Sequence, residues 1–248
     1  MNELHEKFNN EGLTIVGVTS ESKAETEPWV KEKGAKYAYA YDKGGKFQNA
    51  MGVNGIPHAL LVNSQGAIVW EGHPGSLNEE EIRKALTGAL KRPLWDLPKT
   101  FAPVKSAFLK GDFATAIKAA SALPGDDAKQ LAETIKSVVA GTLASAEKKK
   151  ADGDFLGAQK DLQRLAKGVK GLPEEQAVAE GIAFLTKDAD AVKGIKLQKE
   201  LEKILELPAK SKGDKAKRRE ALENFASKNP GTFAAAAAKK AVVDMTKQ

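Results

Sequence analysis

The stretch GVNGIPHALLV, residues 52–62, decides the fold of the first part of the chain. It holds two glycines, then an Ile56-Pro57 bond, and then a short apolar run that is typical of a buried strand. A loop that ends in X-Pro at the start of a strand is one of the few places where folded proteins keep a cis peptide bond. We therefore expect the Ile56-Pro57 bond to be cis and Pro57 to face a functional site.

Helix and strand patterns alternate on both sides of this loop. The run LTIVGV is apolar and β-branched, which predicts a strand covered on both faces. Thr26 is the expected N-cap of the following helix, Gly34 its end, and Asn78 the N-cap of the last helix. The predicted elements are a helix at 2–8, a strand at 13–18, a helix at 28–33, a strand at 37–41, a short helix at 46–51, a hairpin of strands 58–62 and 67–72 around NSQG, and a helix at 79–90. This order predicts an α/β domain.

Composition and charge change near residue 98. The net charge is −1 up to Lys99 and +7 from Thr100 onward, and alanine and lysine dominate the second part. Two prolines in KRPLWDLPKT interrupt any helix at this point. We therefore predict an α/β domain over 1–91, a linker over 92–100, and a second domain over 101–248.

The second part has a helical pattern with a weak repeat. Strand patterns are absent after residue 101, and the segments GDFATAIKAASAL and GDFLGAQKDLQRL begin 42 residues apart, at Gly111 and Gly153. A shorter echo, GTFAAAA, begins at Gly231. The Gly-x-Phe-x-x-Ala pattern resembles the turn between the helices of tetratricopeptide repeats. We expect an all-α domain of helical hairpins in which Phe113 and Phe155 are buried at equivalent places.

The first part resembles a known family. Its element order, the loop GVNGIP and the hairpin LLVNSQGAIVWEG are similar to the thioredoxin-like fold, in particular to the redoxins related to thiol-disulfide reductases of the bacterial envelope. The resemblance covers residues 2–90. It implies that Pro57 is the cis-proline beside the active-site disulfide and that Ile56 offers its backbone to a substrate strand. His58 follows Pro57 directly, which makes it a candidate for lining the substrate groove; the alternative is a solvated or structural histidine. A protein disulfide or dithiol is the implied partner, and the periplasm or envelope the implied location.

The chain departs from this family in having no cysteine. Redoxins of this type carry Cys-x-x-Cys at the start of the helix that NELHEKF matches here, preceded by a strand in the middle of the sheet. The α/β domain is therefore expected to be an incomplete thioredoxin-like domain without catalytic residues, and we expect the missing strand and cysteines just upstream of Met1. A fragment or misassigned start, a genuine non-catalytic descendant and a chance similarity are the three explanations.

Other classes of site find little support in the sequence. No apolar run approaches the roughly 20 residues of a membrane span, and the charged N-terminus is unlike a secretory signal. The three histidines lack the spacing of a metal site, so we expect no metal and no cofactor. The basic runs at 147–153 and 210–219 lack interleaved aromatic residues, so we do not expect nucleic acid as a partner. The tryptophans are expected to be core or interface anchors.

Two functions remain as hypotheses. The first is a thioredoxin-family thiol-disulfide oxidoreductase in its full-length form, inactive as written because the thiolate is the reacting group. The second is a non-catalytic binding or scaffold protein that uses its helical repeats to hold another protein.

Overall fold

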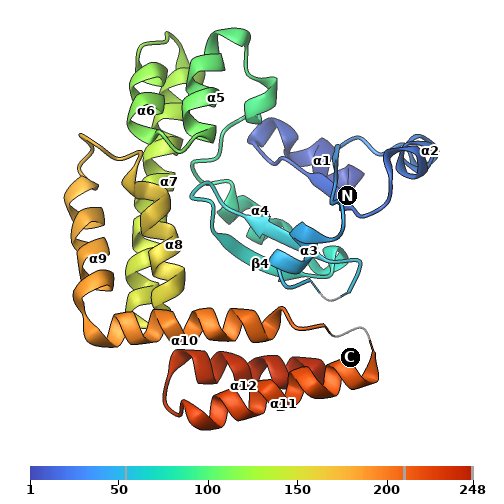
Figure 1. Cartoon of the computed structure of the whole chain (residues 1–248). Coiled ribbons are helices and arrows are strands. Elements are labelled where there is room, and N and C mark those ends of the chain that lie inside the picture. The colour runs from blue at the N-terminus through green and yellow to red at the C-terminus, as the bar shows by residue number, and fades with distance from the viewer. Residues whose placement is uncertain (54, 209–210, 247–248) are drawn as a thin grey trace. The chain divides into compact units, whose positions relative to one another are not determined.

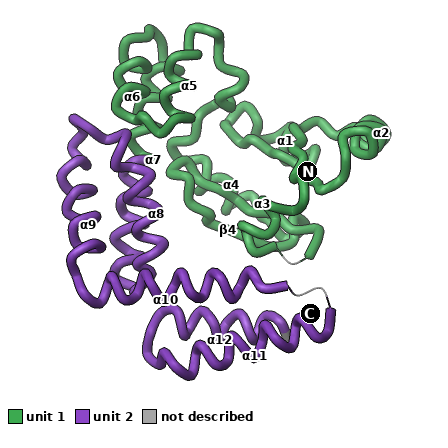
Figure 2. Tube along the Cα trace, in the orientation of Figure 1, with its two compact units in different colours: residues 1–138 green, residues 139–248 purple. Residues whose placement is uncertain are grey.

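The computed structural model describes residues 1–53, 55–208 and 211–246 (Figure 1). The chain forms two compact units, residues 1–138 and 139–248 (Figure 2). They divide inside one long helix, α7 (Asp126–Ala151). The domain boundary at 92–100 stays a prediction, and that segment holds a short 3-10 helix, η3 (Leu94–Asp96).

The first ninety residues of unit 1 form the α/β part. Its elements are α1 (Asn2–Phe8), η1 (Asn9–Glu11), β1 (Val16–Thr19), α2 (Lys23–Lys33), β2 (Ala38–Tyr41), α3 (Lys46–Ala50), β3 (Ala59–Val62), β4 (Ile68–Gly72), η2 (Pro74–Ser76) and α4 (Glu79–Ala85). This order confirms the predicted alternation. The part is an incomplete thioredoxin-like domain with few, short strands.

The four described strands form two separate two-stranded sheets. β1 pairs in parallel with β2, and β3 pairs antiparallel with β4, with a register shift between Leu61 and Val62. The expectation that the first strand is covered on both faces is wrong, because Val16 is 41% exposed and Val18 is 47% exposed. The described strands also do not join into one sheet.

Helix ends differ from the prediction where a better cap lies nearby. α2 begins at Lys23, because Ser22 and Glu25 form a reciprocal capping box. Thr26 is therefore not the N-cap; it is buried, and its hydroxyl donates to the Ser22 carbonyl. Asn78 caps α4 as predicted, but the helix ends at Ala85 instead of near residue 90.

Asp42 joins the parallel sheet to α3. Its amide donates to the Thr19 carbonyl, which continues the β1–β2 pairing, and its carboxylate accepts the amides of Phe47 and Gln48 at 2.9 Å each. A carboxylate that satisfies two free amides of a helix start also fits the positive end of the helix dipole. The short helix α3 is therefore fixed to the end of the sheet.

Beyond residue 98 the described chain is helical, as predicted. The elements are η4 (Lys99–Phe101), α5 (Ala102–Leu109), α6 (Phe113–Ser121), α7, α8 (Phe155–Ala166), α9 (Glu175–Lys187), α10 (Ala189–Leu205), α11 (Lys212–Lys228) and α12 (Phe233–Thr246). No helix in the described part is long and apolar enough to cross a bilayer.

The repeated Gly-x-Phe segments begin helices in the same way. Gly111, Gly153 and Gly231 all have positive φ, and the phenylalanine two residues later is the first residue of α6, α8 or α12. The residue between them caps the helix in each case, by accepting the amide of Thr115, Gly157 or Ala235. The positions are equivalent in local structure, as expected.

Burial of the three phenylalanines is unequal. Phe113 is 1% exposed and packs edge-on against Phe108 at 6.0 Å, as predicted. Phe155 is only half-buried, contrary to the expectation, and its ring lies against Gly194 and Phe184. Phe233 is 40% exposed. The repeat therefore fixes the turn and the helix start, whereas the neighbouring helices decide the burial.

Gln198 holds α10 to the turn before α8 within unit 2. This side chain is 5% exposed; its carbonyl accepts the Leu156 amide at 2.6 Å and its amide donates to the Gly153 carbonyl at 2.7 Å. The Gly153 carbonyl begins the Gly-Asp-Phe turn, and the Leu156 amide follows directly after it in the first turn of α8. A single buried amide thus satisfies one donor and one acceptor of a turn about forty residues away.

Replacing Gln198 with Ala is expected to lower the free energy of unfolding by about 2–4 kcal/mol, because a buried donor and a buried acceptor lose their partner. Urea denaturation followed by far-UV circular dichroism measures the change. The exposed neighbour variant Lys199→Ala is the control and should shift the transition by less than about 0.5 kcal/mol. Equal stability of the two variants would contradict the buried amide's role.

Replacing Asp42 with Asn is expected to destabilise the chain in a pH-dependent way. Hydrogen bonds from the Gln48 and Phe47 amides lower the Asp42 pKa below its usual 3.8. The stabilisation is therefore present at neutral pH, above the unfolded-state pKa, and is lost as pH falls through the lower folded-state value. The measurement compares urea midpoints of wild type and Asp42→Asn from neutral pH to below 3.8.

The difference between these two proteins should shrink as the pH falls. Asp96→Asn changes an exposed aspartate in η3 and serves as the matched control. A difference for Asp42→Asn that stays constant across the range would show that the carboxylate does not act as a charged cap.

Candidate functional site

The loop between α3 and β3 carries the three predicted site residues. The Ile56-Pro57 peptide bond is cis. Ile56 is 85% exposed, and Pro57 and His58 are also exposed, directly before β3. The structure thus presents Ile56, Pro57 and His58 together on one accessible segment, although Asn54 of the same loop lies outside the described residues.

The approach to this segment is held by backbone bonds. Gly52, with a φ of +67°, donates its amide to Asn49, and the Val53 amide donates to the Gln48 carbonyl at 3.0 Å. The Gln48 side chain in turn donates to the Val53 carbonyl at 3.3 Å. Since Asp42 holds the start of α3, the chain is anchored from the end of β2 to Val53. The exposed residues 56–58 therefore follow a segment that hydrogen bonds hold in place.

Helix α1 is the element that the resemblance equates with the active-site helix. At its start, Asn2 donates to the Gly34 carbonyl at 2.9 Å and accepts the Lys36 amide at 3.1 Å. Lys36 also pairs with Glu6, and the hydrogen bond from its ammonium lowers the Glu6 pKa. These contacts hold α1 against the turn that follows α2.

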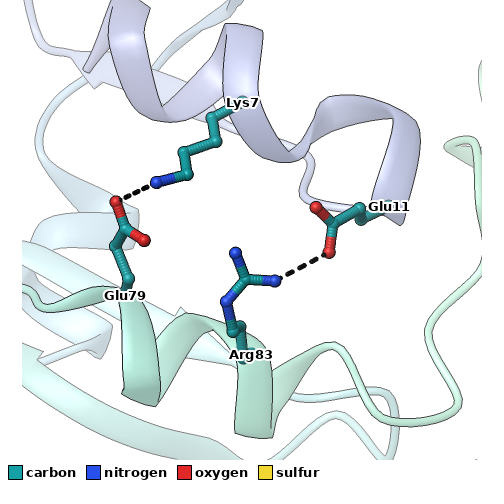
Figure 3. Close-up of polar contacts among 4 residues, drawn as sticks. All are labelled: Lys7, Glu11, Glu79 and Arg83. Carbon is teal, nitrogen blue, oxygen red and sulfur yellow. Dashed lines mark hydrogen bonds and ion pairs between the residues drawn. The ribbon is translucent and has the colours of Figure 1, made fainter.

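The other side of α1 contacts α4 (Figure 3). Lys7 pairs with Glu79, and Arg83 pairs with Glu11 of η1 at 3.3 Å. Between these pairs Phe8 is fully buried, and the Arg83 guanidinium lies 4.9 Å from its ring centroid. Exposed ion pairs contribute about 0–1 kcal/mol each, whereas burying a phenylalanine contributes about 1.5–3 kcal/mol. Phe8 is therefore the main anchor between the two helices.

The placement of Pro57 beside the start of α1 stays a prediction. The described contacts fix α1 to α4 and to the turn after α2, and they fix the loop to α3. None of these contacts joins α1 directly to the loop that carries Pro57. What the structure establishes is an accessible Ile56–His58 segment at the start of β3.

A shallow hollow beside the first turn of α1 was not found by sequence reasoning. It has a volume of about 450 Å³ and is lined by residues 1–3 and by Trp29, Lys33, Ala35 and Tyr37. Tyr37 stacks on Tyr39 with 5.3 Å between ring centroids, and burial raises the Tyr39 pKa. The lining residues are far apart in the sequence, so no local pattern indicates the hollow.

The histidines and tryptophans noted in the sequence were also located in the structure. His73 accepts the Gly75 amide at 3.1 Å and so begins η2. Trp29 and Trp95 are 48% and 59% exposed, so neither is a core anchor. Within the described ranges, no group of three or more potential ligands could hold a metal ion.

The lysines of the first basic run, residues 147–153, form ion pairs, whereas the second run, residues 210–219, includes the start of a helix. In the first, Lys148, Lys149 and Lys150 pair with Asp152, Asp161 and Glu147, respectively. In the second, Lys210 lies outside the described residues, and α11 begins with a capping box between Ser211 and Asp214. Local carboxylates therefore partner the lysines of the first run.

Comparison with known proteins supports the α/β part. The AhpC/TSA family model matches residues 1–71. The thiol-disulfide oxidoreductases ResA of Bacillus thuringiensis (strain Al Hakam) and Bacillus anthracis are each 29% identical over 93 residues, which is 37% of this chain and 51% of theirs. ResA of Bacillus cereus (strain ATCC 10987 / NRS 248) is 28% identical over the same length.

The chain thus spans about half the length of the curated relatives it matches. No solved structure matches the chain significantly. The matched region includes α1, both sheets' first strands and the Ile56–His58 segment. On these matches and its order of elements, the N-terminal part of the chain is similar to thioredoxin-like redoxins of the AhpC/TSA family; it is cysteine-free in this sequence and is followed by helices.

Proposed function

We propose that this chain supplies the substrate-binding side of a thiol-disulfide exchange site whose cysteines come from residues outside the printed sequence. The observation that carries the proposal is the exposed Ile56–His58 segment, which lies within the region matched by the redoxin family. Ile56 offers its backbone to an extended segment of a protein disulfide or dithiol. Pro57 and His58 line the same groove.

The chemistry of such a site follows from thiol-disulfide exchange. A thiolate attacks one sulfur of the substrate disulfide, forms a mixed disulfide and expels the other substrate sulfur as a thiolate. A second thiolate then attacks the mixed disulfide, which releases the reduced substrate and leaves an oxidised cysteine pair. This chain has no cysteine, so its own residues contribute binding and orientation, not electron transfer.

The binding role predicts a difference between two substitutions at one position. Ile56→Pro removes the backbone donor, whereas Ile56→Ala keeps it, and the 85% exposed side chain contributes little to stability. The probe is fluorescein-labelled insulin B chain, reduced and carbamidomethylated, followed by fluorescence anisotropy. Ile56→Pro should weaken binding about tenfold, the value of one hydrogen bond, and Ile56→Ala by less than about threefold.

Two results would contradict the proposal. One is equal affinity of wild type and Ile56→Pro for the insulin B chain. The other is reduction of insulin by the chain above the rate with dithiothreitol alone, because a cysteine-free protein has no thiolate to exchange. Ile68→Ala changes an aliphatic residue of β4 that is 49% exposed and serves as the control for nonspecific binding.

We also propose, as a second function, that the helical domain holds another protein. The observation that favours it is an exposed aromatic group in unit 2. Phe184 is 40% exposed, lies 6.4 Å from the half-buried Phe155, and has the Lys150 ammonium 5.1 Å from its ring centroid. Exposed aromatic residues beside a cation are typical anchors of protein interfaces.

The binding role of the helical domain predicts that Phe184→Ala weakens a complex formed by the native protein. Cross-linking of the complex in its own cells, followed by mass spectrometry, identifies the partner. The affinity of the purified pair should then fall about tenfold or more in Phe184→Ala, as expected for an aromatic anchor, and remain unchanged in the control Leu207→Ala. Leu207 is 42% exposed, so a similar loss in both variants would contradict a specific role of Phe184.

A further inference from the structure

The positive charge of the chain is concentrated in its last three helices. The net charge is 0 over residues 1–138, −1 over residues 139–190 and +7 over residues 191–248. The last of these ranges holds nearly all of α10 together with α11 and α12. A surplus of this size attracts anionic partners to the surface that carries it.

Four lysines form a row on the solvent-facing side of α10. All four are exposed, and they follow one another at intervals of three or four residues: Lys193, Lys196, Lys199 and Lys203. This spacing brings a lysine to nearly the same side of the helix in every turn. The other side of α10 is buried, with Ile195 7% exposed and Leu201 5% exposed. We call these four residues the lysine row.

The lysine row has no carboxylate partner among the residues that the structure describes. Glu200 lies on the same side of α10 but forms no ion pair with the row, and Glu202 pairs with Lys160 of α8 instead. The lysines of the first basic run, residues 147–153, are in contrast all paired. Lysines three or four residues apart on a helix repel one another. The row therefore holds like charges that an acidic partner neutralises.

We propose that the lysine row is a docking site for an acidic helix of another protein. A helix whose glutamates or aspartates recur at the spacing of the row presents one carboxylate to each lysine, because both helices have the same rise per residue. Opposite charges on facing helices determine the choice of partner in coiled coils in the same way. Val192, one turn before Lys196, is 48% exposed, and an apolar residue of the partner covers it.

Other anionic occupants fit the lysine row less well. Single-stranded nucleic acid is held by aromatic side chains on which bases stack, and α10 contains none. A helix that docks on a membrane inserts its apolar face into the lipid, whereas the apolar face of α10 is buried in the protein. Residues 1–138 of the chain itself have no surplus of negative charge. The acidic helix of a second protein is therefore the favoured occupant.

This inference goes beyond both proposed functions. It requires no thiol, and it involves neither the Ile56–His58 segment nor Phe184. Loss of binding in Ile56→Pro or Phe184→Ala leaves the lysine row unchanged. Conversely, failure of the peptide experiment on the row leaves those two functions untouched.

Fluorescence anisotropy of labelled peptides mixed with the whole chain tests the proposal. The probe is a capped, alanine-rich helical peptide with glutamates at the spacing of the lysine row and a leucine on the same side. The control peptide has the same composition, with its glutamates distributed around the helix. The chain should bind the probe about tenfold more tightly, because only the probe faces the row with all its carboxylates. Salt at about 0.5 M should remove most of this difference.

A matched pair of triple variants checks the site of binding. The row variant combines Lys196→Gln, Lys199→Gln and Lys203→Gln. The control variant removes the same charge from exposed lysines of α11, by Lys212→Gln, Lys215→Gln and Lys217→Gln. The row variant should bind the probe about tenfold more weakly and the control variant less than about threefold more weakly. Glutamine keeps the helix propensity of lysine, and if the row variant does not fold, the two peptides still decide the question.

Three outcomes overturn the proposal. The first is equal affinity of the chain for the two peptides. The second is an equal loss of affinity in the two variants, which would mean a general attraction to net charge. The third is tighter binding of phosphatidylserine vesicles or single-stranded DNA than of the probe, lost in the row variant, which would make a lipid surface or a nucleic acid the occupant.

Discussion

The carboxylate of Asp42 is the contact on which the arrangement of the candidate site depends. It lies where the β1–β2 pairing ends, and it accepts the amides of Phe47 and Gln48 in the first turn of α3. A five-residue helix has too few internal hydrogen bonds to be stable alone, so its position follows from its cap. The loop to β3 leaves from this helix. Without the cap, neither the start of the loop nor the Ile56–His58 segment would have a fixed base.

A second constraint acts on α1, where burial outweighs charge. The ion pairs to α4 and to Lys36 are exposed, and their contribution is small for that reason. Phe8 and Ile82, in contrast, are fully buried. The burial of Phe8 thus contributes more to holding α1 than the exposed ion pairs around it. This arrangement keeps the helix equated with the redoxin active-site helix packed even though no cysteine is present.

The helical part and the α/β part differ in how their backbone groups are hydrogen-bonded. In the helical part, most backbone amides find their partners within their own helix, and side chains such as Gln198 accept amides at the helix starts. In the α/β part, backbone pairing needs a neighbouring strand, and β1 and β3 each have one such neighbour among the described residues. Helices tolerate the loss of a neighbour more easily than strands, because a strand edge has no internal partner.

Features that depend on local chemistry could be predicted from residues that are close together in the chain. The order of elements, the NSQG hairpin, the Asn78 cap, the Gly-x-Phe helix starts and the cis Ile56-Pro57 bond all follow from residues close in sequence. Its resemblance to redoxins, carried by several motifs in register, agrees with the family match over residues 1–71. The start of α2 was missed, because Ser22 with Glu25 forms a stronger cap than Thr26 alone.

The burial of these elements, in contrast, depends on long-range packing. The exposed Val16 and Val18, the half-buried Phe155 and the hollow beside α1 depend on which segments meet in space. An apolar strand pattern indicates that burial is favourable, but burial requires a neighbour that the pattern cannot supply. For the same reason the pairing of Gln198 with a turn about forty residues away could not be derived from the sequence. Local residues therefore set secondary structure and caps, whereas long-range packing set burial.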